Sequence, residues 1–239
     1  MNKEQLSAMI FAFFALTGFT APSQAAGRVE LPVTAGLANY DEDGFISIAG
    51  EVKNVGSAWV CSPRIDIELL DAQGRPIAVQ SILTAAKQDA GLDDADGVYA
   101  ERIFLPPGEV AVFQYWRDKA KLKGLKPASH RVKASAGECP SARTNIEILE
   151  LKTSRDQDAY YRVRGILKNT GKGDCRSPRA VVGLYGADGR LIKAAEETPD
   201  AMFQKVLKPG QSVAFEFRSA DEGKRFGKAR VWGDCNYPE

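Results

Sequence analysis

The side chains that could do covalent chemistry in this chain are four cysteines and a single histidine, His130. A nucleophilic Ser-His-Asp or Cys-His set would have to use His130, and the chain contains no Gly-x-Ser-x-Gly turn to present a serine. Structural zinc is held by cysteine pairs two to four residues apart, a spacing that no two of these cysteines have. We therefore predict a structural or surface histidine, no catalytic residue, no metal site and no cofactor.

Two acidic loops could bind calcium. Asp41-Glu42-Asp43-Gly44 and Asp93-Asp94-Ala95-Asp96-Gly97 place oxygen ligands beside a glycine that permits a sharp turn, and calcium takes six to eight oxygens. Neither loop has the twelve-residue pattern with its closing glutamate. We favour polar hairpin turns for both loops. Calcium remains the alternative, and the candidate ligand or partner contacts are Asp93, Asp94 and Asp96.

The sequence motifs around these residues occur twice along the chain. Gly50–Gly56 (GEVKNVG) is matched by Gly165–Gly171 (GILKNTG), and Ser62-Pro63-Arg64 by Ser177-Pro178-Arg179, at a constant offset of 115 residues. Solenoid and propeller repeats are about 20–50 residues long, so this offset indicates one duplicated domain. The predicted domains are residues 26–142 and 143–239.

The duplication assigns two cysteines to each copy. It favours the pairing that repeats within domains, Cys61–Cys139 and Cys175–Cys235, over the two other possible pairings. In the chain-entropy model each such disulfide stabilises the fold by roughly 4 kcal/mol. Cys175 aligns with Val60 instead of Cys61. Because a shift of one residue turns a strand side chain to the opposite face, we expect this position to lie in a loop or a bulge.

Arg64 and Arg179 occupy matching positions in the two copies. A guanidinium suits carboxylate or phosphate, so the two could be paired anion contacts. We favour a structural interpretation, in which the proline begins an edge strand and the arginine stem lies over the sandwich surface. Trp59, two residues before Cys61, could pack on a disulfide or meet a partner. The candidate partner contacts in this region are therefore Trp59, Arg64 and Arg179.

Alternation of apolar and polar residues predicts strands through both copies. Residues 45–52 and 65–69 show the two-residue period of half-buried strands, and turn signals recur between such segments. Several short strands with regular turns indicate a β-sandwich. The predicted fold class is all-β, with two tandem immunoglobulin-like antiparallel β-sandwiches. Strands are expected at 28–33, 45–52, 65–69, 76–83, 98–105, 110–116 and 131–136, and again at 146–151, 161–167, 180–185, 191–195, 213–217 and 229–232.

The N-terminal residues 1–25 have the pattern of a secretory signal peptide. Leu6–Phe19 is an apolar run of about 14 residues, shorter than the roughly 20 that span a bilayer, and Ser23-Gln24-Ala25 offers small residues to a signal peptidase. We expect a periplasmic or secreted protein with no membrane span in the mature chain, a setting in which disulfides form. The net charge of +1 gives no reason to expect a nucleic-acid partner.

Several repeated motifs point to one family. Ile67–Asp71 and Val182–Gly186 stand where that family has Phe-x-Leu-Tyr-Asp, and Leu105–Gly108 and Leu207–Gly210 stand where it has Leu-x-Pro-Gly with a Phe shortly after. The chain thus resembles the FxLYD-type immunoglobulin-like domains of exported bacterial and archaeal proteins. The leading Phe is aliphatic in both copies, and the cysteines lie outside the family pattern. The resemblance covers about 75 residues of each copy and implies a two-sheet sandwich with no known catalytic residues.

These observations predict an exported, non-enzymatic binding or structural module of the cell envelope, made of two disulfide-linked sandwiches. Its expected partner is a protein or a cell surface, because sandwiches present loops and edge strands to partners. The alternatives are a carbohydrate-active or other hydrolase on a sandwich scaffold and a calcium-stabilised adhesin segment. A specific function should lie where the two copies differ. One such place is the segment between Gly74-Arg75 and Pro107-Gly108, which is 13 residues longer than the matching segment between Gly189-Arg190 and Pro209-Gly210.

Overall fold

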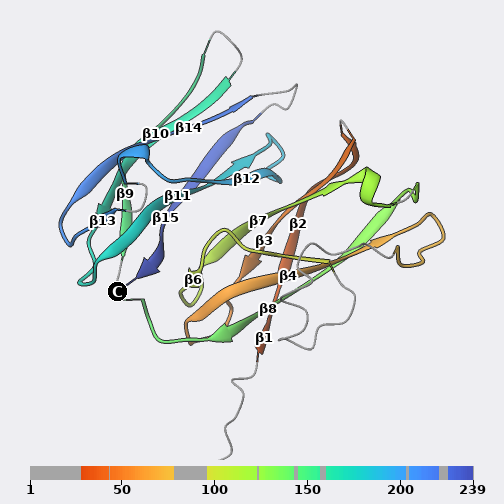
Figure 1. Cartoon of the computed structure of the whole chain (residues 1–239), viewed down its shortest axis with the longest axis horizontal. Helices are drawn as coiled ribbons and strands as arrows, with labels where there is room; N and C mark the ends of the chain where they lie inside the picture. Colours follow the sequence, from red (N-terminus) through yellow and green to blue (C-terminus); the bar gives the residue numbers. More distant parts are fainter. Residues whose placement is uncertain are drawn as a thin grey trace, which may run out of the picture.

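The computed structural model of this chain consists of two β-sandwiches in tandem, one formed by β1–β8 and the other by β9–β15 (Figure 1). The structure describes residues 28–42, 44–77, 96–122, 124–142, 145–156, 160–202, 205–220 and 226–238. Strands and two short 3-10 helices account for the regular structure of this part of the chain. The all-β prediction is confirmed.

The strands of the first sandwich form two sheets. Sheet I has the order β1-β8-β4-β5, with β6 also pairing with β4, and sheet II has the order β2-β3-β7. Every pairing is antiparallel. The elements are β1 (Arg28–Leu31), β2 (Val33–Glu42), β3 (Phe45–Lys53), β4 (Val60–Leu70), β5 (Asp96–Tyr99), β6 (Phe104–Leu105), β7 (Val110–Asp118), η1 (Lys119–Leu122) and β8 (Ser129–Glu138).

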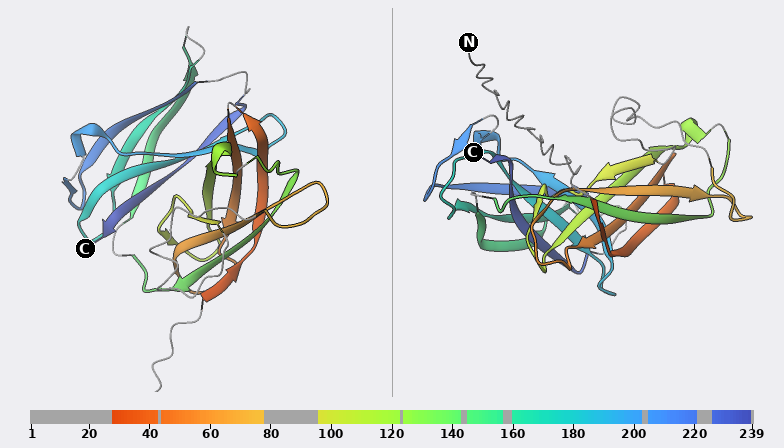
Figure 2. Two further views of the ribbon diagram at one scale, coloured as in Figure 1. Left: turned by 45° about the vertical axis from the view of Figure 1, so that its right-hand side comes forward. Right: turned by 90° about the horizontal axis from the view of Figure 1, so that it is seen from below.

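The second sandwich repeats this plan. Sheet III has the order β12-β11-β13, with β15 also pairing with β11, and sheet IV has the order β14-β10-β9. The four sheets follow one another from I to IV across the molecule, as the views in Figures 1 and 2 show. The elements are β9 (Ile146–Arg155), β10 (Tyr160–Asn169), β11 (Cys175–Tyr185), β12 (Leu191–Glu197), η2 (Asp200–Met202), β13 (Val206–Leu207), β14 (Ser212–Ala220) and β15 (Lys228–Pro238).

The repeated glycines lie beneath repeated phenylalanines. Gly50 is paired with Phe113 across β3 and β7, and Gly165 with Phe215 across β10 and β14. A Cβ atom on Gly50 would come within 2.6 Å of Cε1 of the Phe113 ring, and one on Gly165 would be 2.8 Å from Cε1 of Phe215. Both rings are buried. Each glycine is therefore needed because a large core ring lies directly on its backbone.

The repeated asparagine fastens the turn at the end of β3 in the first sandwich and of β10 in the second. Asn54 is buried and donates to the carbonyls of Ala58 at 2.8 Å and Leu105 at 3.0 Å, while its side-chain oxygen accepts from the Gly56 amide at 3.0 Å. Asn169 makes the matching bonds to Gly173, Leu207 and Gly171. Because every polar group of this buried amide is used, its replacement would leave buried carbonyls without a donor. The Lys-Asn-x-Gly repeat is structural.

Both predicted disulfides are present, Cys61–Cys139 and Cys175–Cys235, with Cα–Cα distances of 5.9 and 5.6 Å. The first cysteine of each pair was expected in a loop or a bulge: Cys61 lies in β4 beside a bulge, whereas Cys175 lies in β11 with no register shift at this position. The shift of one residue does turn the side chain: Cys175 and Cys235 are buried in the second core, whereas Cys61 and Cys139 are only half-buried. A bulge follows Cys61, between it and Arg64.

Two expected strands differ from the prediction. Residues 98–105 were expected to form one strand, but β5 and β6 are separate, and residues 100–103 between them meet β7 and the second domain instead of β4 alone. Of the strand expected at 76–83, Pro76 bridges to Leu70 and Ile77 is buried, and the remainder lies outside the described residues. β5 pairs with β4 on the side where β12 pairs with β11.

The outer faces of sheets II and III pack against each other and join the two sandwiches. β12 crosses β2, β3 and β7. Tyr185 donates to the Glu51 carboxylate at 2.5 Å, and the amide of Ala194 donates to the side-chain oxygen of Gln114 at 3.0 Å. Arg190 donates to the carbonyl of Gly36 at 2.9 Å. The apolar residues of this domain interface are Ala49, Val112, Val181, Tyr185, Leu191, Ala194 and the half-buried Trp232.

Candidate functional site

The repeated Ser-Pro-Arg segment places Arg64 in β4 and Arg179 in β11. Ser62 and Ser177 have positive φ angles of 48° and 52°, a left-handed conformation that turns the chain just before the proline. Both strands are central in their sheets, so the expectation that the proline begins an edge strand is wrong. The expectation that the arginines lie over the surface is also wrong, because Arg64 and Arg179 are 5% and 6% exposed.

Arg64 pairs with a carboxylate of its own strand. Its Nε donates to Asp66 at 2.7 Å, and its guanidinium lies against Gly97 of β5, where an added Cβ would come within 3.0 Å of it. Arg64 thus stabilises the outer face of sheet I. Because β5 covers the Arg64 guanidinium on this side, the side chain cannot bind an external anion there.

Arg179 lies at the boundary of the two domains and joins them. Its Nη2 donates to the carbonyl of Glu101 in the first domain at 2.7 Å and to the Asp234 carboxylate at 3.0 Å, and its Nη1 is paired with Glu196. Asp234 in turn accepts from the amide of Ile103 at 2.9 Å. The structure therefore assigns Arg179 a role at the domain interface, with two carboxylates already neutralising its charge.

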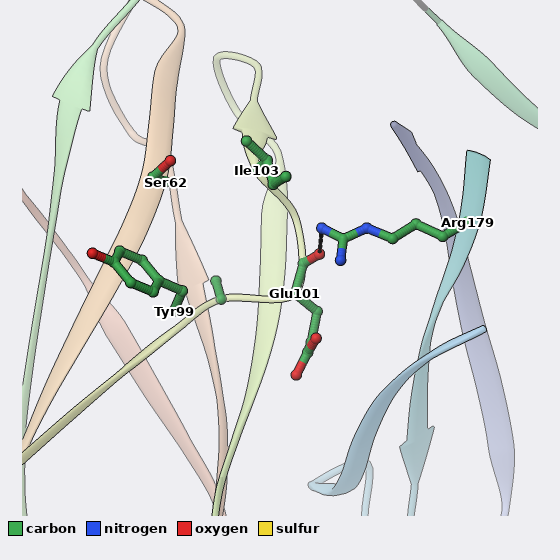
Figure 3. A pocket seen from close by; sticks show the side chains of 6 residues that line it. Ser62, Tyr99, Glu101, Ile103 and Arg179 are labelled. Atoms are coloured by element: carbon green, nitrogen blue, oxygen red, sulfur yellow. Dashed lines mark hydrogen bonds between the residues drawn. The ribbon is translucent and has the colours of Figure 1, made fainter. Parts of the chain in front are cut away.

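A cavity of about 340 Å³ opens beside this contact (Figure 3). The segment between β5 and β6 forms one wall, and Arg179 approaches from the second domain (Figure 3). The carboxylate of Glu101 makes no hydrogen bond or ion pair with the described residues, and burial raises its pKa while the nearby Arg179 lowers it. The cavity is lined by Ser62, Tyr99, Ala100, Glu101, Ile103 and Arg179.

The structure places Asp96 in the core instead of a ligand-binding loop. Asp96 is 2% exposed and forms an ion pair with Arg117, and the Tyr115 hydroxyl donates to it at 2.6 Å. Burial raises the pKa of Tyr115. Asp96 is therefore neither in the expected polar turn nor in the alternative calcium or partner contact, since it lies in β5 and its oxygens serve this buried cluster between sheets I and II. The neighbouring Asp93 and Asp94 lie outside the described residues.

Trp59 and His130 each contact residues of their own domain or its boundary. Trp59 lines a small hollow of about 50 Å³ at the domain boundary, together with Phe104 and Asp234. His130 Nδ1 is 2.5 Å from the Tyr40 hydroxyl, and burial lowers the pKa of His130. This contact links β8 of sheet I to β2 of sheet II, which fits a structural histidine.

The part of the chain that the structure describes contains no group of three or more His, Cys, Asp and Glu side chains that could hold a metal ion. Within the same residues, no helix has the length and apolar character to cross a membrane. The side chains of the acidic loop at 41–43 are not among those described.

Neither a family model nor a curated protein sequence matches this chain. Among solved structures, it is similar to red sea bream transglutaminase, with a TM-score of 0.28 and 9% identity over 87% of this chain and 29% of that one. It is also similar to the exo-chitosanase CsxA of Amycolatopsis orientalis, with a TM-score of 0.27 and 14% identity over 84% of this chain and 26% of that one. The chain thus spans little more than a quarter of either protein. At these TM-scores, the likeness carries no argument about activity.

Sequence reasoning missed most residues of the cavity and of the domain interface. Tyr99, Glu101 and Asp234 belong to no motif, and only the fold brings them to Arg179. The sequence does contain one indication of the domain interface. Residues 180–185 of β11 read Ala-Val-Val-Gly-Leu-Tyr without alternation and are all buried, the pattern of a strand covered on both faces.

Proposed function

We propose that this chain is an exported, non-enzymatic binding module in which two sandwiches act as one unit and bind a protein partner at their boundary. The observation that carries the proposal is the cavity beside Arg179, whose walls come from both domains. A site of this kind, concave and lined by a few polar groups among apolar ones, is typical of ligand binding. It is also typical of such sites to occur between domains.

Packing between the domains supports this proposal. Apolar contacts and hydrogen bonds made by side chains that include Arg179, Tyr185, Arg190 and Gln114 hold the second domain against the first. A cavity at such a boundary keeps its shape, so binding there costs little in ordering the site. The two disulfides support export, because disulfides persist in oxidising compartments. The resemblance to FxLYD-type domains stays a prediction.

Site-specific photo-cross-linking of the full chain in the envelope fraction of its source organism would test the proposal. A photoreactive residue at Ser62, in the cavity wall, should capture a defined protein that mass spectrometry identifies. The same residue at Arg164, exposed on sheet IV far along the stack, is the control and should not capture it. Capture of the same proteins from both positions, or of none from Ser62, would contradict binding at the boundary.

Export is tested separately by the location and N-terminus of the processed chain. We expect the protein in the periplasm or medium, beginning near residue 26. Recovery of the full chain in the cytoplasm would contradict this part of the proposal.

A further inference from the structure

The first sandwich has a strand, β8, that is fully paired on one side and only partly paired on the other. β4 pairs with β8 from one end to the other. On the opposite side, β1 pairs only with residues 134–137, and the chain then crosses at Pro32 to β2 in sheet II. In the part of the chain that the structure describes, residues 129–133 therefore have no strand on the side away from β4. We call these five residues the open edge of β8.

An open cavity of about 380 Å³ lies where β1 ends and the open edge begins. Its lining includes Leu31 of β1, Val33 of β2 and Val132 of β8, with Glu30 at the β1 end. Val132 stands opposite the core residue Ile67, so it points into the sandwich. Val33 and Val132 are half-buried and pack against the first core. An added strand would therefore cover apolar surface that the sandwich leaves half-exposed.

The outward-facing side chains of the open edge are cationic. Arg131 and Lys133 are exposed on the outer face of sheet I, where Arg131 is 3.4 Å from the Glu68 carboxylate. Lys133 stands opposite Asp66, which is paired with Arg64 at 2.7 Å. Lys133 itself makes no ion pair with the described residues. Because opposite charges on neighbouring strands stabilise a sheet, the positions beside Arg131 and Lys133 favour acidic side chains.

The same charges disfavour pairing between two copies of this chain. Antiparallel pairing of two open edges would bring Arg131 and Lys133 of one copy close to those of the other. Like charges that face each other destabilise a sheet, and lysine on an edge strand is a common means of preventing such pairing. A strand that carries acidic side chains has the complementary charge.

We propose that the open edge of β8 binds an extended peptide segment as a further antiparallel strand of sheet I, in line with β1. Peptide side chains alternate between the faces of the sheet, so that acidic ones face Lys133 and Arg131 and apolar ones cover Val132. Backbone hydrogen bonds supply affinity, and the alternating side chains supply selectivity. The cavity at the domain boundary is beside β5, at the opposite edge of sheet I. This inference thus goes beyond the proposed function and does not depend on it.

Hydrogen exchange of the full chain, followed by NMR with the acidic peptide acetyl-Glu-Val-Glu-Val-Thr-amide, tests the inference. Amides of residues 129–133 that exchange rapidly in the free protein should become protected, with saturation in the millimolar range. The basic peptide acetyl-Lys-Val-Lys-Val-Thr-amide is the matched control and should bind about fivefold more weakly. Equal binding of the two peptides, or protection only elsewhere, would overturn the inference.

Two N-methylated forms of the acidic peptide test the strand pairing itself. Along an antiparallel strand, alternate residues turn their N–H groups toward a given neighbour. One form is methylated at its first, third and fifth residues and the other at its second and fourth. Methylation should abolish binding of one form and preserve binding of the other. Loss of binding by both forms, or by neither, would rule out a backbone-paired strand.

Charge reversal on the protein locates the site. Lys133→Glu should weaken binding of the acidic peptide about fivefold and strengthen binding of the basic one. Lys208→Glu makes the same change in an exposed turn of the second domain and should alter neither. An unchanged preference in Lys133→Glu would refute the site. If Lys133→Glu did not fold, the two N-methylated peptides with the native chain would decide.

The free protein tests the alternative occupants of this edge. If the amides of residues 129–133 that point away from β4 were already protected without peptide, the chain itself would cover the edge. Protection that grows with protein concentration would indicate a second copy. Either result would overturn the inference, whereas photo-cross-linking at Ser62 bears on the boundary site alone.

Discussion

Matching strand positions are charged and face outward in one domain but are apolar and buried in the other. On the outer face of sheet I, β4 presents Asp66 and Glu68, and at the matching positions of β11 in sheet III stand Val181 and Gly183. The first pair faces outward beside Lys133 and Arg131, whereas Val181 is fully buried against the other domain. The turns and asparagine fasteners are alike. The duplication therefore kept the strand scaffold and changed which faces are exposed.

Sheets II and IV show the same exchange in reverse. Ser47 and Ala49 of β3 are small and buried at the interface, while Arg162 and Arg164 occupy their places in β10. The two arginines pair with Glu216 at 3.0 and 2.8 Å on the exposed face of sheet IV. Each domain thus has one charged face and one packed face. A few outward-pointing residues thus distinguish the packed faces from the charged ones.

The disulfides give the largest expected difference between the domains. In the chain-entropy model, either one closes a loop worth about 4 kcal/mol. Cys175→Ala with Cys235→Ala should cost more than Cys61→Ala with Cys139→Ala, because only the second pair of sulfurs fills a buried core. Guanidinium denaturation of the two double variants measures this. An equal or reversed order would show that burial of the second pair of sulfurs adds no stability.

Placing the first domain's charge on the second domain should open the interface. Val181→Asp grafts the residue found at Asp66 and buries a carboxylate without a partner, at a cost of about 3 kcal/mol or more. Small-angle scattering should show separated domains. Glu68→Val, which places an apolar residue on the charged outer face of sheet I, should stay within about 0.5 kcal/mol. A compact Val181→Asp protein with unchanged stability would show that the interface is not held by this face.

The buried ionic cluster is confined to the first domain. Where β7 has Tyr115 and Arg117, β14 has Phe217 and Ser219 at the matching positions. Tyr115→Phe removes the bond to Asp96 and should cost about 1–2 kcal/mol in urea denaturation. Phe217→Tyr adds a hydroxyl to the apolar second core and should cost a similar amount. Neutral behaviour of Tyr115→Phe would mean that the cluster does not stabilise the fold.

The smallest expected effect concerns Glu101. Burial raises its pKa in the folded state, so the folded protein prefers the protonated form, and stability falls as pH rises through that pKa. Glu101→Gln should therefore stabilise the protein at pH 7 by less than the changes above, and the gain should vanish below about pH 4. Thermal unfolding across this pH range measures it, with Glu147→Gln as control. A gain that persists in acid would exclude titration of Glu101 as the cause.

Sequence reasoning reached the scaffold because short-range patterns encode it. Turn glycines, alternating strands and the repeated Lys-Asn-x-Gly predicted the sandwiches, and the repeat itself gave the disulfide pairing. The domain interface could be inferred only by comparing the two copies, because residues 180–185 lack the apolar and polar alternation of residues 65–69. Either segment taken alone predicts only a strand.

The candidate site could not be reached in this way. Asp96 was expected in a polar turn, yet it pairs with Arg117, 21 residues along the chain, across the sandwich. Glu101 follows no motif, and its significance comes from Arg179, 78 residues away in the other domain. Such contacts depend on how sheets stack, which local residue patterns do not record.

The packing of sheet III on sheet II has a consequence for assembly. The contact is head-to-tail, because the face of the second domain that it uses corresponds to sheet I of the first, and not to sheet II. A head-to-tail contact can in principle be repeated without end and produce a filament. Here both ends of the stack are charged, with Asp66 and Glu68 on sheet I and Arg162 and Arg164 on sheet IV. These ends resemble the capping units of repeat proteins, whose outer faces are polar.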